Sequence, residues 1–499
     1  MGGVNYLELL TLAMPETVIV LVALLVLAVD LLFMRDDPME NRQIITTALA
    51  CFGCAGAIFF MFNSHAHGNA LHGMLVVDPL TQLAKAALLV LTCFTLLISL
   101  SSRFTSHVGE FVALILFATL GMMFLVSAED LLMIFVALEL TSLSLYILTA
   151  FQKEKLGSSE AALKYFLFGG MAAAFTLFGL SLIYGLSGAT NLREIAANLK
   201  GKGIDPLLLV AIVMTVIGFG FKIAAVPFHL WAPDAYQGAP TPSAAFIASG
   251  SKVASFFVLA KVMMLGFAGA EGSGVWRQFV SGWVPVLATI ALFSMILGNL
   301  AAIAQSNVKR LIAYSAVAHG GYALLGVLCD TNQGLASLLY YVVTYAFTVI
   351  GALGVVSVVE ARAGESNLND FAGLSRSAPI VSICMMIFML SLAGIPPLAG
   401  FFGKFYLFTA TAAAARDLGL LWLVIAAIAM SAVSLYYYLQ VLKQIFVATP
   451  AGDTPSTAAK PSLATVSALA LLALIVLVLG CLPDLVVSPL LSAMQSAGF

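Results

Sequence analysis

The sequence predicts an all-α integral membrane protein of about 14 transmembrane helices, with two inverted five-helix repeats and two broken helices, the seventh and the twelfth. The first observation is composition. Of the 499 residues, 62% are hydrophobic and only 9% are charged, which excludes a water-soluble globular domain. The second is the recurrence of apolar runs of about 18 residues or more, long enough to cross a bilayer. The third is that a glutamate and several lysines lie inside these runs.

The apolar runs are separated by stretches that contain Gly, Pro, Asn and charged residues. The first run lacks the basic segment of a cleaved signal peptide, so we expect it to be retained. Pro227 interrupts the seventh run, and Pro396 and Pro397 interrupt the twelfth. Because proline removes a backbone donor, these two helices should kink or unwind. The predicted helices cover residues 14–34, 43–63, 80–101, 109–127, 130–151, 159–186, 206–228, 241–266, 279–302, 308–329, 332–359, 378–411, 417–446 and 462–482.

An internal repeat is visible in the two interrupted runs. Gly218–Lys222 matches Gly400–Lys404 at an offset of 182 residues (404 minus 222). The same offset places Glu139 opposite position 321, beside His319, although the prolines do not superpose. Since five helices are an odd number, the second unit should be inverted, as in many transporters. The predicted units are 1–108 (first three helices), 109–270 (repeat A, helices 4–8), 271–447 (repeat B, helices 9–13) and 448–499 (helix 14).

Lysine and arginine are distributed unevenly among the connections between the predicted helices. The odd-numbered connections hold eleven and the even-numbered connections hold five. By the positive-inside rule, the odd-numbered connections face the cytoplasm and both termini face the opposite side.

Charged side chains at mid-membrane depth are costly, about 2.5–3.5 kcal/mol each on insertion scales, and usually mark a functional pathway. Glu139 lies midway along the fifth run, and Lys222 and Lys404 lie beside the helix breaks, where freed carbonyls and water can solvate a charge. Lys252 is ten residues past Pro242, or about 15 Å, near the midplane. Glu139 is the natural partner of Lys222. The alternative is a static buried pair that only fixes helix packing.

Other polar and titratable residues also lie inside the predicted runs. Ser142 and Tyr146 follow Glu139 on one helical face and could hydrogen-bond along the path. Lys85 and Lys261 lie near the ends of their runs, so we expect their ammonium groups to reach the headgroups. His229 and His319 have side chains suited to proton relay. A packing role for either histidine remains open.

Several functions are excluded. There is no basic stripe of the kind that nucleic-acid binding requires. The six cysteines are dispersed and look like small core residues. No Rossmann glycine fingerprint and no metal-ligand cluster is present, so we expect no cofactor and no metal in this chain.

Five stretches carry a resemblance to a known family: ALELTSLSLYILTAF, EAALKYFLFGG, FKIAAVPFHLWAPDAYQGAPTPSAAFIASGSKVA, VKRLIAYSAVAHGGY and AGIPPLAGFFGKFYLF. They closely resemble the subunit N family of bacterial NADH:quinone oxidoreductase, respiratory complex I, and the likeness covers nearly all the predicted helices. The M-type relative is expected to have a glutamate in place of Lys404, and the L-type has a long C-terminal lateral helix for which this chain leaves no room.

The resemblance implies an antiporter-like subunit of the proton-pumping membrane arm. By position, Glu139 looks like the family's fifth-helix glutamate, Lys164 like its sixth-helix lysine and Lys222 like its seventh-helix lysine. Lys252 and His229 resemble the connecting residues of the central axis, and Lys404 the terminal lysine of the second half-channel.

The sequence thus predicts proton translocation driven by quinone reduction in partner subunits, through a relay of Glu139, Lys164, Lys222, His229, Lys252, His319 and Lys404. The resemblance implies a multi-pass protein of the bacterial inner membrane, with the M-type subunit and the small K- and J-type subunits as partners. FMN, iron-sulfur clusters and quinone belong to partner subunits. The alternatives are a subunit of a multi-subunit cation/proton antiporter, or a passive structural subunit of the arm.

Overall fold

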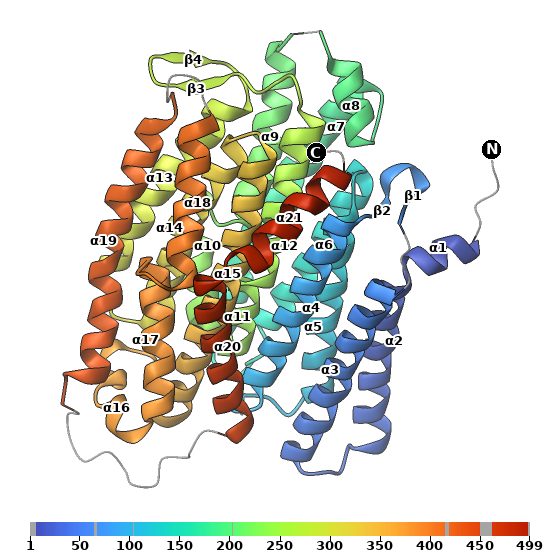
Figure 1. The fold of residues 1–499 in the computed structure, drawn as a ribbon. Coiled ribbons are helices and arrows are strands. Elements are labelled where there is room, and N and C mark those ends of the chain that lie inside the picture. The colour runs from blue at the N-terminus through green and yellow to red at the C-terminus, as the bar shows by residue number, and fades with distance from the viewer. Residues whose placement is uncertain are drawn as a thin grey trace.

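The computed structural model describes residues 6–63, 67–102, 104–201, 203–414, 419–449 and 462–497. They form a bundle of long helices with two short hairpins at one end (Figure 1). The helices are α1 (Tyr6–Leu12), α2 (Met14–Ala28), η1 (Val29–Phe33), α3 (Met39–Asn63), η2 (Leu71–Gly73), α4 (Pro79–Ser99), α5 (Val108–Ser127), α6 (Leu131–Thr149), α7 (Leu156–Ser187), α8 (Leu192–Leu199), α9 (Pro206–Lys222), α10 (Trp231–Gly238), α11 (Thr241–Ala248), α12 (Gly250–Lys261), η3 (Val262–Gly266), α13 (Trp283–Ile303), α14 (Val308–Leu328), α15 (Asn332–Ala363), η4 (Leu368–Phe371), α16 (Leu374–Ser377), α17 (Pro379–Ala393), α18 (Ala399–Ala414), α19 (Leu421–Phe446), α20 (Leu463–Cys481) and α21 (Asp484–Ala497).

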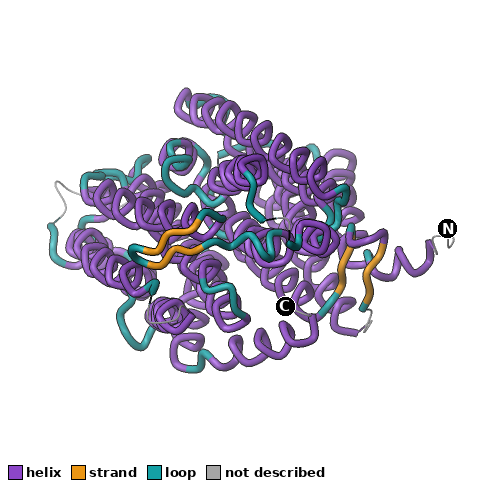
Figure 2. Tube along the Cα trace, turned by 90° about the horizontal axis from the view of Figure 1, so that it is seen from above, coloured by secondary structure: helices purple, strands orange, loops and turns teal. Residues whose placement is uncertain are grey.

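The hairpins pair β1 (Gly68–Ala70) with β2 (Leu75–Val77) and β3 (Ser273–Val275) with β4 (Gln278–Val280). Seen from above, they lie on the same end of the bundle (Figure 2). We call this end the even face, because even-numbered connections meet there, and the opposite end, which carries α16, the odd face (Figure 1). Within the described residues, twelve helices are long and apolar enough to cross a membrane, and α9 and α17 are shorter apolar helices. Each predicted run corresponds to one of these fourteen.

Both predicted helix breaks are present. The chain leaves α9 after Lys222 and re-enters helix at α10 (Trp231–Gly238), and it leaves α17 at Gly394 and re-enters at α18 (Ala399–Ala414). At the first break, the Trp231 indole donates to the Phe221 carbonyl over 3.0 Å. This side-chain hydrogen bond satisfies one of the helix-end carbonyls that the break leaves without a backbone partner.

The backbone shows an internal repeat at two matching corners, each of which is a place where an isolated antiparallel bridge joins two connecting segments. Antiparallel bridges join Asp130 to Asn191 and Asn307 to Asn367. Asp130 and Asn307 are both helix N-caps. The long helices that follow them, α7 and α15, each have 32 residues, and each ends at a glycine in the left-handed region. In Figure 1, α8, which follows the first bridge, lies at the even face, whereas α16, just after the second bridge, lies at the odd face. The two corners are therefore inverted relative to each other.

These corners correct the repeat offset expected from the Gly-Phe-Lys match. The N-caps are 177 residues apart (307 minus 130), not 182. At 177, Glu139 corresponds to Ala316 and His319 to Ser142. Lys222 precedes its break while Lys404 follows its own, so these two lysines do not occupy equivalent places. The short motif match was misleading because helix ends and corner bridges, rather than local composition, set the register.

The centre of the bundle is the eighth span, α11–α12–η3, which is buried except at Met264 and Leu265, together with α14 and α15, which are buried over most of their length. These helices are rich in Ala, Gly and Ser, and small residues allow membrane helices to approach closely. Beyond the fourteenth span, the chain adds α21, which crosses the bundle obliquely beside α15 and α4 (Figure 1); the sequence did not predict it.

Candidate functional site

A series of buried cationic and aromatic side chains occupies the middle of the bundle. Lys252 on α12 is 3% exposed, and its ammonium donates to the Ala316 carbonyl of α14 over 2.6 Å. It also lies 5.8 Å from the centre of the Tyr345 ring. A cation is stabilised by the face of an aromatic ring, so Tyr345 links Lys252 to the next member of the series.

That next member is His319 on α14, which lies between Lys252 and Lys404. Its ring centre is 4.8 Å from that of Tyr345 and 5.7 Å from that of Tyr322. Its Nδ1 is 2.6 Å from the Tyr341 hydroxyl and its Nε2 is 3.0 Å from the Tyr438 hydroxyl. Because a hydroxyl both donates and accepts, each imidazole nitrogen can exchange roles with its neighbour. The sequence left open whether His319 only packs; the structure surrounds it with hydrogen-bonding groups.

Lys404 continues the series on the other side of His319. It is 4% exposed and sits 5.3 Å from the centre of the Tyr322 ring. Its ammonium donates to the carbonyls of Leu392 and Ala393 over 2.9 and 3.1 Å, and to the Ser431 hydroxyl over 2.8 Å. Both carbonyls belong to the last turn of α17, which the break leaves without helical partners. The break therefore solvates the charge, as the sequence predicted.

The first repeat holds a second cationic group at its own break. Lys222, the last residue of α9, hydrogen-bonds the Ser142 hydroxyl, which in turn donates to the Leu138 carbonyl. Glu139 is near enough to interact electrostatically with Lys222, but within the described part of the chain it forms no ion pair within 4.0 Å. Lys222 therefore contacts Ser142, one of the two polar residues expected along the path, whereas its expected pairing with Glu139 is not a direct ion pair among the described residues. The Tyr146 hydroxyl is buried and finds no hydrogen-bond partner among the described residues.

A small cavity lies between Lys222 and α12, the helix that carries Lys252. It has a volume of about 10 Å³ and is lined by Ser142, Lys222, Ser251 and Ser255, among others. That is close to the space one water needs, and the hydroxyls supply the polar partners that a buried water requires. Ser251 directly precedes Lys252 on α12, so the cavity extends from Lys222 to the helix that carries Lys252, although Lys252 itself does not line it.

Two residues implicated by sequence lie apart from this series. Lys164 is 40% exposed and pairs with Glu160 over 2.7 Å and with Asp234 over 3.0 Å. His229 lies in the break after α9, with its ring centre 6.4 Å from that of Tyr314. Its Nδ1 is buried and has no hydrogen-bond partner in the described ranges. The structure thus places Lys222, Lys252, His319 and Lys404 in one series and leaves Glu139, Lys164 and His229 at its margin.

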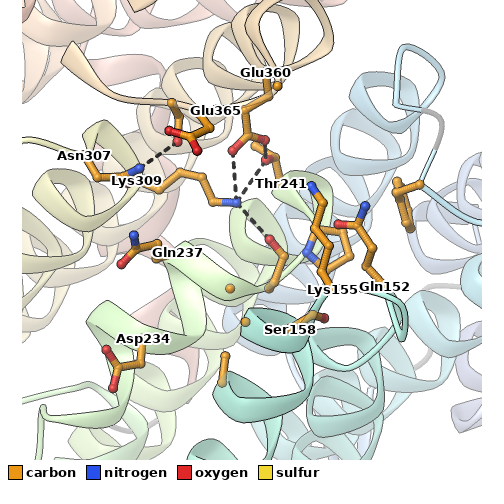
Figure 3. Close-up of a pocket in the computed structure, with 18 of the residues that line it drawn as sticks. Gln152, Lys155, Ser158, Asp234, Gln237, Thr241, Asn307, Lys309, Glu360 and Glu365 are labelled. Atoms are coloured by element: carbon orange, nitrogen blue, oxygen red, sulfur yellow. Dashed lines mark hydrogen bonds and ion pairs between the residues drawn. The ribbon is translucent and has the colours of Figure 1, made fainter. Parts of the chain in front are cut away.

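Lys164 and Asp234 belong to a polar cavity of about 740 Å³ on the odd face. We call it the odd-face cavity (Figure 3). Its walls come from the α6–α7 connection, the end of α10, the start of α14 and the end of α15. Lys309 and Glu360 lie at its inner side, and Figure 3 shows the Lys309 ammonium directed at the Glu360 carboxylate.

Among the described residues, three lysines with enclosed ammonium groups form ion pairs that the sequence did not predict. Lys85 pairs with Glu16 over 2.6 Å, and both side chains are 1% exposed. Lys261 lies 3.5 Å from Glu129, which also accepts from Arg193. Lys309 lies 3.3 Å from Glu360. The expectation that Lys85 and Lys261 snorkel to the headgroups is wrong, because both ammonium groups are enclosed by neighbouring helices and paired there.

Position along a run could not reveal these pairs, since each partner comes from a distant segment. The one available signal was the presence of an acidic residue near the end of another apolar run. Among the described residues, no group of three or more His, Cys, Asp and Glu side chains could hold a metal ion.

Residues 128–431 match the sequence profile described as NADH:quinone oxidoreductase/Mrp antiporter, transmembrane. A protein of Acidobacterium capsulatum named NADH-quinone oxidoreductase subunit N 2 is 52% identical, covering 97% of this chain and 99% of that protein. Subunit N of Rhodospirillum rubrum is 39% identical, covering 87% of each.

Solved structures show the same fold. A chain of respiratory complex I from Thermus thermophilus with bound Aureothin superposes with a TM-score of 0.76 at 32% identity, over 95% of this chain and 98% of that one. A chain of the Mrp complex from Dietzia sp. DQ12-45-1b gives a TM-score of 0.80 at 20% identity over 97% of each, a likeness of fold alone.

Proposed function

Because the chain belongs to the NADH:quinone oxidoreductase/Mrp antiporter family of membrane proteins, we propose that it moves protons across the membrane as a subunit of an NADH:quinone oxidoreductase. Its relay is Lys222, Lys252, His319 and Lys404, with Glu139, Lys164 and His229 at the margins. The energy comes from quinone reduction in partner subunits.

The observation that supports this function best is the position of His319 between Lys252 and Lys404. All three are at most 5% exposed, and tyrosine rings contact each of them. In a low-dielectric interior, two ammonium groups around one imidazole repel each other, so a proton gained by one member favours release by another. A series of titratable groups with shared hydroxyl partners is what stepwise proton transfer requires.

The chain itself performs no redox chemistry in this proposal. FMN, the iron-sulfur clusters and quinone are bound by partner subunits, and the membrane partners are the M-type subunit and the small K- and J-type subunits. The protein lies in the bacterial inner membrane. The odd face is cytoplasmic and both termini are periplasmic, in line with the excess of basic residues in the odd-numbered connections.

A cation/proton antiporter subunit is the second candidate, favoured by the fold shared with the Mrp complex chain. The two are distinguished by purifying the native assembly. Partners that carry iron-sulfur clusters and oxidise NADH support the oxidoreductase, and partners without redox centres support the antiporter. A passive structural role predicts that substituting the relay lowers neither pumping nor the proton-to-electron ratio.

The test replaces Lys404 with methionine in the complete complex, reconstituted into vesicles that report proton release during NADH oxidation. We expect the pumping rate to fall by about 100-fold, as loss of a proton-transferring group does in general acid–base steps. The matched control is Lys443→Met, which removes an exposed lysine from α19. A Lys404→Met complex that pumps as fast as Lys443→Met removes Lys404 from the relay.

A further inference from the structure

The odd-face cavity is lined in part by an ion pair, Lys309 and Glu360, that the proposed relay does not include. The Lys309 side chain is 4% exposed and that of Glu360 is 25% exposed. Both line the cavity. Glu360 is therefore the more exposed partner of the pair, and the Lys309 ammonium that points at it is almost fully enclosed (Figure 3).

The pair is held by a set of polar contacts rather than by the charges alone. The Lys309 ammonium donates to the Ala239 carbonyl over 2.9 Å and to the Thr241 hydroxyl over 3.3 Å, and it lies 3.3 Å from Glu360. The Thr241 hydroxyl also donates to the Glu360 carboxylate. Ala239 is the C-cap of α10 and Thr241 begins α11, so the lysine lies at a helix junction with a free carbonyl.

Two helices run from the Lys309 site toward Lys252: α14, which carries Lys309, and α11, which begins with Thr241 and is continued by α12. On α14, Ala316 follows Lys309 by seven residues, a rise of about 10 Å, and its carbonyl already accepts from Lys252. Thr241 and Lys252 belong to the same buried span. A rise of about 10 Å is longer than one bridging water spans, so transfer from Lys309 to Lys252 requires a chain of more than one water between these helices.

We propose that Glu360 and Lys309 form the proton-uptake site of this chain, delivering protons from the odd-face cavity to Lys252. Hydronium in the cavity gives its proton to the Glu360 carboxylate and leaves as water. The resulting carboxylic acid gives that proton to Lys309 in its neutral amine form, which restores the carboxylate. The Lys309 ammonium then passes a proton through water to Lys252 in its neutral amine form, which restores the Lys309 amine. This inference rests on the proposed function.

A purely structural ion pair is the competing explanation, and one substitution separates it from proton uptake. Lys309→Arg keeps the positive charge and the ion pair, but a guanidinium does not give up its proton in proteins. Glu360→Gln keeps the size and the hydrogen bond from Thr241, but it cannot accept a proton. A structural pair tolerates Lys309→Arg, whereas a proton-transfer pair does not, so this substitution separates the two explanations. Glu360→Gln impairs either kind of pair, because it leaves the enclosed Lys309 ammonium without its counter-charge.

The measurement is proton release per NADH oxidised by the complete complex in vesicles. We expect Lys309→Arg and Glu360→Gln each to lower the pumping rate by about tenfold or more. Glu360→Asp, which retains a carboxylate, is expected to keep most of the rate. The matched controls are Lys155→Arg and Glu365→Gln, which change exposed residues lining the same cavity and are expected to pump normally.

The outcomes also separate this proposal from the function on which it rests. If Lys404→Met stops pumping while Lys309→Arg or Glu360→Gln pumps normally, uptake at this pair is wrong and the relay stands. The uptake site is likewise overturned if Glu360→Asp lowers the pumping rate as much as Glu360→Gln. The length of the side chain, rather than the presence of a carboxylate that binds a proton, would then determine the rate. If Lys404→Met also pumps normally, the proposed function itself fails.

Discussion

Removing one partner of the Glu16–Lys85 pair should destabilise the protein far more than removing both. The two groups are 2.6 Å apart and each is 1% exposed, so with an effective dielectric of about 20 their attraction is about 6 kcal/mol. Desolvation offsets much of this, since each buried ion costs several kcal/mol. Lys85→Met leaves the Glu16 carboxylate buried without its counter-charge, a loss of about 3–5 kcal/mol. Glu16→Met combined with Lys85→Met replaces the pair by apolar groups of similar size, which is close to neutral.

The assay is equilibrium unfolding of the purified chain in detergent for the wild type, both single variants and the double variant. The single variants should lose about 3–5 kcal/mol and the double variant less than about 1.5 kcal/mol. The double variant, assembled into the complex, should pump at the wild-type rate because the pair lies outside the relay. If each single variant unfolds like the wild type, or if the double variant loses as much as the sum of the singles, the pair is not a coupled buried ion pair and the reasoning is wrong.

Two further predictions concern a loop carboxylate and a helix contact. Partial burial and the Glu271 carboxylate raise the pKa of the exposed Asp330, in the α14–α15 connection, to about 6. Since the folded-state pKa of this acid is raised, the folded state loses stability as pH rises from about 4 to about 6. Asp330→Asn, which tolerates the left-handed φ of 49°, should therefore raise the unfolding temperature at pH 8 and have little effect at pH 4; equal effects at both would contradict the assignment. A methyl group at Gly298 on α13 would lie 2.6 Å from the Ala318 amide nitrogen and 3.0 Å from the Tyr314 carbonyl oxygen of α14. Because these are backbone atoms next to His319, Gly298→Ala should cost about 1–3 kcal/mol of stability and lower pumping, whereas Gly185→Ala, which meets open space, should do neither.

The sequence was most informative where a property depends on a single segment. Length and hydropathy were sufficient to predict the membrane spans, because a helix must satisfy its own backbone in lipid and span a fixed thickness. Proline positions located both broken helices for the same reason. Lys404 beside its break was recognisable because the break itself supplies the carbonyls that hold the ammonium.

The sequence was misleading where a property depends on which segments meet. The 182-residue match suggested that Lys222 and Lys404 are equivalent, but the bridged corners at Asp130 and Asn307 set a different register. Depth along a run suggested that Lys85 and Lys261 reach the headgroups, but Glu16 and Glu129 lie beside them from helices distant in the chain.

Composition, run length and breaker residues by themselves determined a multi-pass helical membrane protein with charged groups at depth, because these features follow from backbone chemistry in lipid. Only the tertiary structure decided how those charges are used. The energy of a charge in a low-dielectric interior depends mainly on the groups within a few ångströms of it. Helix packing determines which groups those are. That is why His319 joins Lys252 to Lys404, and why Lys309 and Glu360 meet in the wall of the odd-face cavity.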